Sequence, residues 1–188
     1  MPVTYQTADE ETAKFIVHVM ERHHPHLHAA KVRITTVFAF APVDAEGKRT
    51  GPALKHAGYA AAATIKPTTL HRRCQGLGDA ELNIDGDNWS TWPKAKRVAL
   101  IDHELSHLVL KQNDSGGPQL DLLGRPKLTS RLHDWHFGGF VHILERHGED
   151  SFEADHILAD ENGQYLFAWA TDHARKRDSP PPRKRKAG

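Results

Sequence analysis

Apolar residues recur at helical spacing close to the start of the chain. Four of them follow a period of 3.6 residues and share one helix face: Ala13, Ile16, Val17 and Met20. Acidic side chains at positions 9–11 precede this stripe, where the positive end of a helix dipole favours negative charge. The pattern predicts a helix over residues 9–24, which Pro25 ends.

Three later segments have the composition of β-strands. Residues 32–40 are rich in β-branched and aromatic side chains, and residues 59–66 predict a second strand after a Pro- and Gly-containing loop. Residues 80–85 alternate apolar and polar side chains, as a strand with one buried face does. A turn is expected at residues 85–88.

The centre of the chain predicts a long helix. Ser90 or Thr91 can cap its start, and Pro93 is tolerated in its first turn. We expect this helix to continue to about Lys111, because the Gly- and Pro-containing stretch 113–118 follows.

A hairpin and a further helix complete the predicted elements. Segments 120–122 and 127–129 flank a Gly-Arg-Pro turn and predict a hairpin. Residues 134–147 predict a helix closed by Gly148, the residue favoured just after a helix end.

The predicted elements indicate an α+β fold, and the composition is that of an ordinary soluble globular chain with an unusual end. Of 188 residues, 38% are hydrophobic and 26% charged, and no apolar run approaches the ~18 residues of a membrane span. Residues 1–174 are expected to form one domain. Residues 175–188 carry seven basic and one acidic side chain among prolines, so we expect a disordered tail able to touch nucleic acid weakly.

Cysteine usage bears on the compartment. Cys74 is the single cysteine, so the chain has neither an internal disulfide nor a Cys-rich zinc site. The first residues also lack the basic and apolar pattern of a secretory signal. Both features predict a cytoplasmic protein.

The strongest chemical signal is His-Glu-x-x-His inside the central predicted helix. His103 and His107 are four residues apart, so they project from one helix face and can bind one metal ion. Glu104 lies about 100° round the helix axis, where it can take a proton from a zinc-bound water. Val98, Ile101, Leu105 and Leu108 form an apolar stripe beside the histidines.

A catalytic Zn²⁺ site requires a third protein ligand and one open position. The downstream candidates are His133, His136, His142, Glu145 and His147. His133 stands between the predicted hairpin and the next helix, which favours it, and His136 remains a rival one turn further on. The histidines at 23–28 are interrupted by Pro25, so their spacing suits no single site and indicates a structural role.

Several of these motifs together resemble the phage metallopeptidase family. They are Ala99–His107 with its His-Glu-x-x-His, the Gly-rich turn, the short strand containing Lys127, Arg131-Leu132-His133-Asp134, and the first helix ending in His23-His24-Pro25. The resemblance covers about residues 9–148 and extends distantly to SprT-like zincins. It implies His103, His107 and His133 as ligands and Glu104 as base. Residues 135–137 depart from the acidic residues that follow His-Asp in the family, which leaves His136 open.

The resemblance implies a single-domain, minimal zincin-like fold, with a small twisted sheet packed on the helix that carries the motif. Residues 80–85 would be its edge strand above the metal, to which an extended peptide could add. The predicted function is zinc-dependent hydrolysis of peptide or protein substrates. The alternative is a non-catalytic, zinc-stabilised binding module, which a closed four-ligand site including His136 would favour.

Overall fold

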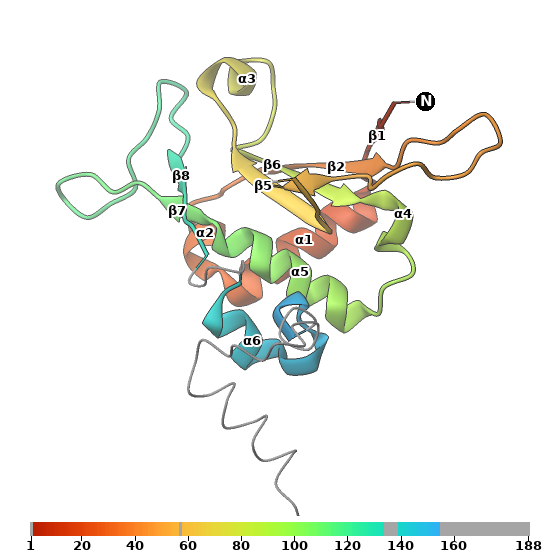
Figure 1. Cartoon of the computed structure of the whole chain (residues 1–188). Coiled ribbons are helices and arrows are strands. Elements are labelled where there is room, and N and C mark those ends of the chain that lie inside the picture. Colours follow the sequence, from red (N-terminus) through yellow and green to blue (C-terminus); the bar gives the residue numbers. More distant parts are fainter. Residues whose placement is uncertain (1, 57, 134–138, 155–188) are drawn as a thin grey trace, which may run out of the picture.

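Four strands form a mixed sheet, against which helices of the described residues pack (Figure 1). The computed structural model describes residues 2–56, 58–133 and 139–154. Its strands are β1 (Thr4–Thr7), β2 (Ile34–Phe40), β3 (Lys55–His56), β4 (Tyr59–Ala60), β5 (Ala63–Pro67), β6 (Ala80–Asp85), β7 (Leu108–Leu110) and β8 (Leu128–Ser130). Its helices are α1 (Glu10–His23), α2 (Pro25–Ala29), α3 (Leu70–Cys74), α4 (Gly86–Trp89), α5 (Lys94–Ser106), α6 (Val141–His147) and a 3-10 turn, η1 (Gly148–Asp150).

The strand order of the main sheet is β1-β2-β6-β5. β1 and β2 are antiparallel, β2 and β6 are parallel, and β6 and β5 are antiparallel. The predicted strand at 80–85 is therefore correct, but its predicted place at the sheet edge is wrong. β6 lies inside the sheet, and β5 forms the edge that contacts α5.

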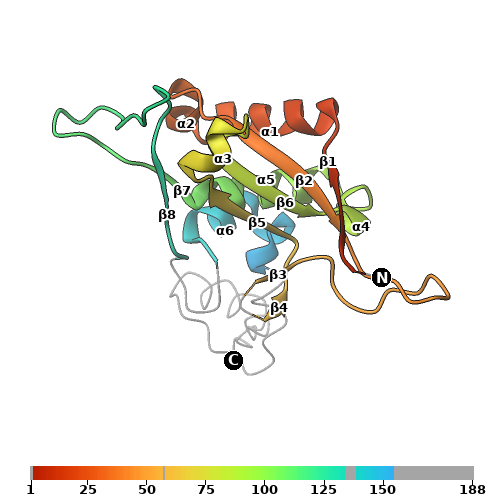
Figure 2. The ribbon, with the colours of Figure 1, turned by 90° about the horizontal axis from the view of Figure 1, so that it is seen from above.

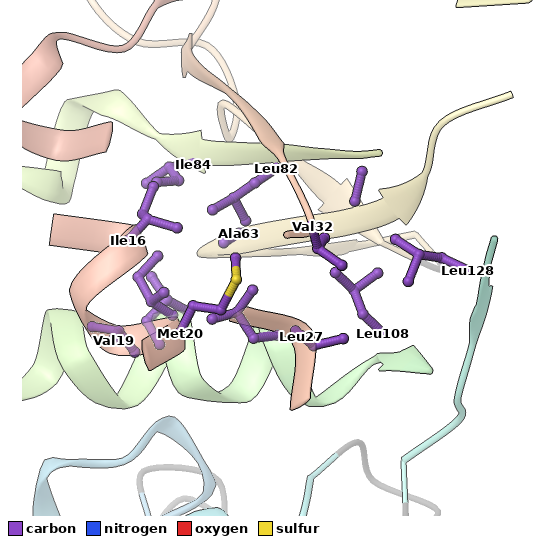
Figure 3. Close-up of a cluster of buried hydrophobic side chains, with 14 of the residues drawn as sticks. Ile16, Val19, Met20, Leu27, Val32, Ala63, Leu82, Ile84, Leu108 and Leu128 are labelled. Atoms are coloured by element: carbon purple, nitrogen blue, oxygen red, sulfur yellow. The ribbon is translucent and has the colours of Figure 1, made fainter. Parts of the chain in front are cut away.

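Helices α1 and α5 cover one face of the sheet, and α6 lies beyond α5 (Figure 1). Alternate residues of β6, Ala80, Leu82 and Ile84, are fully buried on that face. They pack against apolar side chains of the two helices, among them Ile16 and Met20, as Figure 3 shows. This core fixes α5 beneath the sheet.

On the outer face of the sheet, a polar cavity of about 310 Å³ is lined in part by Lys66, Arg72 and Glu81. None of the histidines of the motif lines this cavity.

The first helix was predicted well. α1 spans Glu10–His23, and Asp9 caps it by accepting a hydrogen bond from the Thr12 N–H at 2.7 Å. Pro25 then begins the short α2 in the first helical position, where its missing N–H costs nothing. The expected strands 32–40 and 59–66 correspond to β2 and to β4 with β5, whereas β1 had no pattern long enough to predict it.

The central helix is shorter at both ends than predicted. Pro93 precedes its first residue, and Thr91 instead donates its hydroxyl hydrogen to the Asn88 carbonyl, closing the preceding turn. That turn is the short helix α4, capped by Asp85. α5 ends at Ser106, because the next residues form β7 and pair with β8.

The hairpin forms from different segments than predicted. β8 pairs with β7 across a long connection. Around the predicted Gly-Arg-Pro turn, the chain forms a short antiparallel pairing: the isolated bridge Leu120–Pro126, flanked by hydrogen bonds from the Lys127 N–H to the Gln119 carbonyl and from the Asp121 N–H to the Arg125 carbonyl. β7 and β8 both contact the edge strand β5, beside which they lie in Figure 2. The chain thus passes from α5 through His107 directly into a strand.

The helix expected at residues 134–147 starts later than predicted. α6 spans Val141–His147, residues 139–140 are not helical, and residues 134–138 lie outside the described residues. Gly148 follows the helix with φ of +53°, as predicted. The tail at 175–188 also lies outside the described residues, and within the described part no helix is long and apolar enough to cross a membrane.

Candidate metal centre

Three histidines from two parts of the chain meet at the end of α5. One ring nitrogen each of His103, His107 and His133 lies within 4.8 Å of the others. The Nε2 atoms of His103 and His133 are 3.1 Å apart. Ligand nitrogens in a tetrahedral zinc site stand about 3.3 Å apart, given Zn–N bonds of about 2.0–2.1 Å. The spacing therefore suits a zinc-sized ion.

The local fold explains why His107 and His133 come together. His107 caps the C-terminus of α5, and its carbonyl oxygen accepts a hydrogen bond from the Arg131 N–H at 2.8 Å. This bond continues the pairing of β7 with β8 and places the end of β8 beside the last turn of α5. His133 follows Arg131 by two residues, so it lies close to His107. The tertiary pairing, rather than the helix alone, therefore assembles the cluster.

Hydrogen bonds on the far side of two imidazole rings orient them. The Nδ1 atom of His107 lies 2.8 Å from the Arg131 carbonyl oxygen, which can only accept, so Nδ1 carries the proton. The Nδ1 atom of His103 contacts the Glu153 carboxylate in the same way. Both rings therefore hold a proton on Nδ1 and turn Nε2 toward the centre, the orientation in which a histidine can bind a metal through Nε2.

An aromatic ring supports the three imidazoles. The Phe140 ring lies edge-on to His103, His107 and His133, with centroid distances of 5.1, 4.9 and 5.2 Å. Phe140 itself is fully buried. The three imidazole rings are thus packed on one side against a fully buried aromatic ring.

Burial and mutual repulsion keep two of the imidazoles neutral. Burial, together with the positive charges that His107 and His103 can carry, lowers the pKa of His133 to about 4. Burial also lowers the pKa of His107. Burial opposes protonation of His103 as well, but the Glu153 carboxylate outweighs it and raises the pKa of that ring. Neutral imidazoles are the form that binds a metal.

Glu104 is buried beside this cluster, with only 5% of its surface exposed. Burial raises its pKa to about 7, while the neighbouring His103 and a hydrogen bond from the Ile65 N–H of edge strand β5 act in the opposite direction. The Glu104 carboxyl group therefore connects α5 to the edge strand β5.

The other downstream candidates lie elsewhere. His142 contacts the Ser106 hydroxyl at 2.9 Å, His147 contacts Asp102, and Glu145 is exposed. His136 lies outside the described residues. Glu153, by contrast, was not predicted, because it stands 50 residues from His103 and belongs to no local motif.

A second cluster surrounds Asp102, on the other side of α5. The Asp102 carboxylate is fully buried and accepts hydrogen bonds from His24 at 2.8 Å, from His147 at 2.6 Å and from Arg146. His23 stands 3.9 Å away. His23, Asp102 and His147 are close enough together to hold a metal ion, but Arg146 already pairs with the Asp102 oxygen that an ion would use. We interpret this cluster as structural, which agrees with the role expected for the histidines at 23–28.

Fold and site together define a minimal metallopeptidase-like α+β domain with three convergent histidines. The family follows from the sequence comparison: the model described as "Putative phage metallopeptidase" matches residues 4–162, so the chain belongs to this family. No curated protein and no solved structure matches it. The family name implies a metal, and the three donor nitrogens with their oriented rings fit one.

Proposed function

We propose that the protein is a zinc-dependent metallopeptidase in which His103, His107 and His133 hold the ion and Glu104 is the general base. The observation that carries this proposal is the convergence of three imidazoles within 4.8 Å, directly beside a buried carboxyl group. Two of the rings have their Nδ1 atoms engaged, which leaves Nε2 for the metal.

A bound zinc ion supplies Lewis acidity, which lowers the pKa of water and polarises a peptide carbonyl. Glu104 then accepts a proton from the attacking water and donates it to the departing nitrogen. Its pKa of about 7 without metal suits a group that must do both, and a bound cation lowers that pKa by attraction. The Ile65 N–H holds the carboxyl group in place.

The edge strand β5 is the natural place for an extended peptide. It ends the sheet on the side of α5, and its Ile65 already contacts Glu104. A substrate that pairs with this edge by main-chain hydrogen bonds would bring its backbone to Glu104. We therefore propose that the substrates are peptides or proteins. We also propose that cleavage takes place in the cytoplasm, a reducing compartment in which a free cysteine such as Cys74 stays reduced.

Glu104→Gln tests the catalytic role. Glutamine keeps the size and hydrogen bonding of the side chain but cannot take the proton, so the variant should fold, keep zinc and lose at least the roughly 10²–10⁴-fold that general-base catalysis contributes. Cleavage of an unfolded protein substrate is measured for both forms, with zinc quantified in each. Equal cleavage by both forms would exclude Glu104 as the base. Cleavage by neither form, together with a closed four-ligand zinc site, would favour the zinc-stabilised binding module.

The ligand set is tested in the same preparations. The wild-type protein should hold one zinc ion per chain, and His133→Ala should lower zinc occupancy sharply. His26→Ala is the matched control, because His26 is an exposed histidine outside the centre. Full zinc retention by His133→Ala would move the third ligand elsewhere, to His136 first.

A further inference from the structure

The buried carboxylate of Glu153 contacts the His103 ring on the side that faces away from the metal centre. Glu153 is 1% exposed, and its Oε1 atom accepts the hydrogen on His103 Nδ1. The same oxygen lies 3.3 Å from the Phe140 N–H, which also donates to it. Glu153 therefore joins a proposed ligand to the residue whose ring supports all three imidazoles.

The segment that carries Glu153 is held by a hydrogen bond within it and by an aromatic contact to another part of the chain. The Ser151 hydroxyl accepts a hydrogen bond from the Ala154 N–H at 3.1 Å, which caps the helical residues 152–154. Phe152 packs edge-on against Trp92, with ring centroids 5.4 Å apart. The carboxylate thus reaches His103 from a fixed backbone rather than from a free loop.

We propose that Glu153 is a positioning residue of the metal centre: it keeps the proton of His103 on Nδ1 and holds the ring so that Nε2 faces His107 and His133. This inference rests on the proposed function, in which His103 is a zinc ligand. Metal-binding histidines commonly donate their second ring N–H to a carboxylate, which fixes the tautomer and the ring orientation.

Geometry separates this role from direct ligation. The two nitrogens of an imidazole point away from each other, and Glu153 contacts Nδ1, whereas Nε2 of His103 is the atom that faces His133. A zinc ion among the three Nε2 atoms therefore lies across the ring from Glu153. The carboxylate acts on the metal through His103.

Zinc affinity measures this role. In Glu153→Ala the hydrogen bond is lost, and the dissociation constant for Zn²⁺ should rise about 10–100-fold, the usual effect of removing such a partner. Glu153→Gln keeps an oxygen that accepts the Nδ1 hydrogen, so its affinity should stay much closer to that of the wild type. Equal losses in both variants would show that only the negative charge matters and would overturn the positioning role.

A spectroscopic measurement distinguishes positioning from a general loss of structure. In ¹⁵N-labelled, metal-free protein, at a pH high enough for the His103 ring to be neutral, its ring nitrogens should report a proton on Nδ1 in the wild type and in Glu153→Gln. Glu153→Ala should show a mixture of the two tautomers. An unchanged Nδ1–H tautomer in Glu153→Ala, together with unchanged zinc affinity, would contradict the proposal.

Asp150→Ala is the matched control. It removes an exposed carboxylate three residues earlier in the same segment, and its zinc affinity should equal that of the wild type. A wild-type protein that binds no zinc would refute the proposed function itself. Wild-type binding that Glu153→Ala leaves unchanged would refute only the role of Glu153.

Discussion

In the proposed mechanism, Glu104 is the residue on which the chemistry depends most directly. Burial favours its neutral form, and the nearby Glu153 carboxylate adds to that effect. His103 and the Ile65 N–H favour the charged form, and the balance leaves the pKa at about 7. In the metal-free protein a buried carboxyl group therefore titrates near neutrality.

This titration predicts how the stability of the metal-free protein depends on pH. The folded-state pKa of Glu104 is raised, so its stabilising contribution is complete below the unfolded value of about 4.3 and is lost as pH rises through about 7. Relative to Glu104→Gln, which does not titrate, the wild type should lose free energy of unfolding on the order of 3 kcal/mol between pH 4 and pH 8.

Urea unfolding in the presence of a chelator, at several pH values, provides the measurement. Because all other groups are shared, the difference between the two proteins isolates Glu104. A difference that stays constant across this range would mean that the carboxyl group is not desolvated in the folded protein.

The sequence could predict the residues of the motif, because two histidines and a glutamate at fixed helical spacing carry their geometry with them. It could favour His133 only through its place after a predicted hairpin and through family resemblance. Glu153 and the Arg131 carbonyl were beyond reach, since their contacts join distant parts of the chain and leave no periodic signal. A residue whose role depends on contacts between distant parts of the chain cannot be predicted from local sequence patterns.

At the scale of elements, Asp102 connects three helices. It lies on α5, and it binds His24 at the start of α2 as well as His147 and Arg146 on α6. Burial would raise its pKa, but these hydrogen bonds and the Arg146 charge hold the pKa well below its usual range. The Asp102 carboxylate thus connects α6 to α5.

Asp102→Asn should remove this connection. A depressed folded-state pKa gives stability that is present above the unfolded value of about 3.9 and is lost as pH falls below it. At pH 7 the metal-free variant should therefore be less stable by about 3 kcal/mol, the cost of breaking a buried ion pair. Toward pH 3 the difference should shrink, as measured by urea unfolding. Parallel pH profiles of the two proteins would contradict the role assigned to Asp102.

Element boundaries were predicted where local signals act alone. The Asp9 cap, Pro25 and Gly148 each fix a helix end within the chain that surrounds them. The end of α5 was missed because pairing with β8 competes with the helical pattern after Ser106. The position of β6 was missed because its parallel partner β2 lies more than 40 residues earlier, and alternation reveals a buried face but not the neighbours of a strand.

At the scale of the whole molecule, the centre requires three separate regions: α5, the end of β8 and the segment after α6. The family match runs to residue 162, so it contains all three. The basic residues at 175–188 lie beyond that match. The metal centre and the tail should therefore be separable.

Truncation after Ala174 tests this separation. The removed residues hold seven basic side chains, one acidic side chain and three consecutive prolines, and they offer little apolar surface to bury, so the midpoint of thermal unfolding and the zinc content should not change. Any binding of the full chain to nonspecific duplex DNA should weaken steeply with salt, because it depends on phosphate contacts, and should disappear on truncation. Thermal unfolding, zinc analysis and DNA titration at two salt concentrations check these outcomes. A fall of several degrees in the unfolding midpoint would show that the tail packs against the domain, and DNA binding that survives truncation would locate the basic contact in the body of the protein.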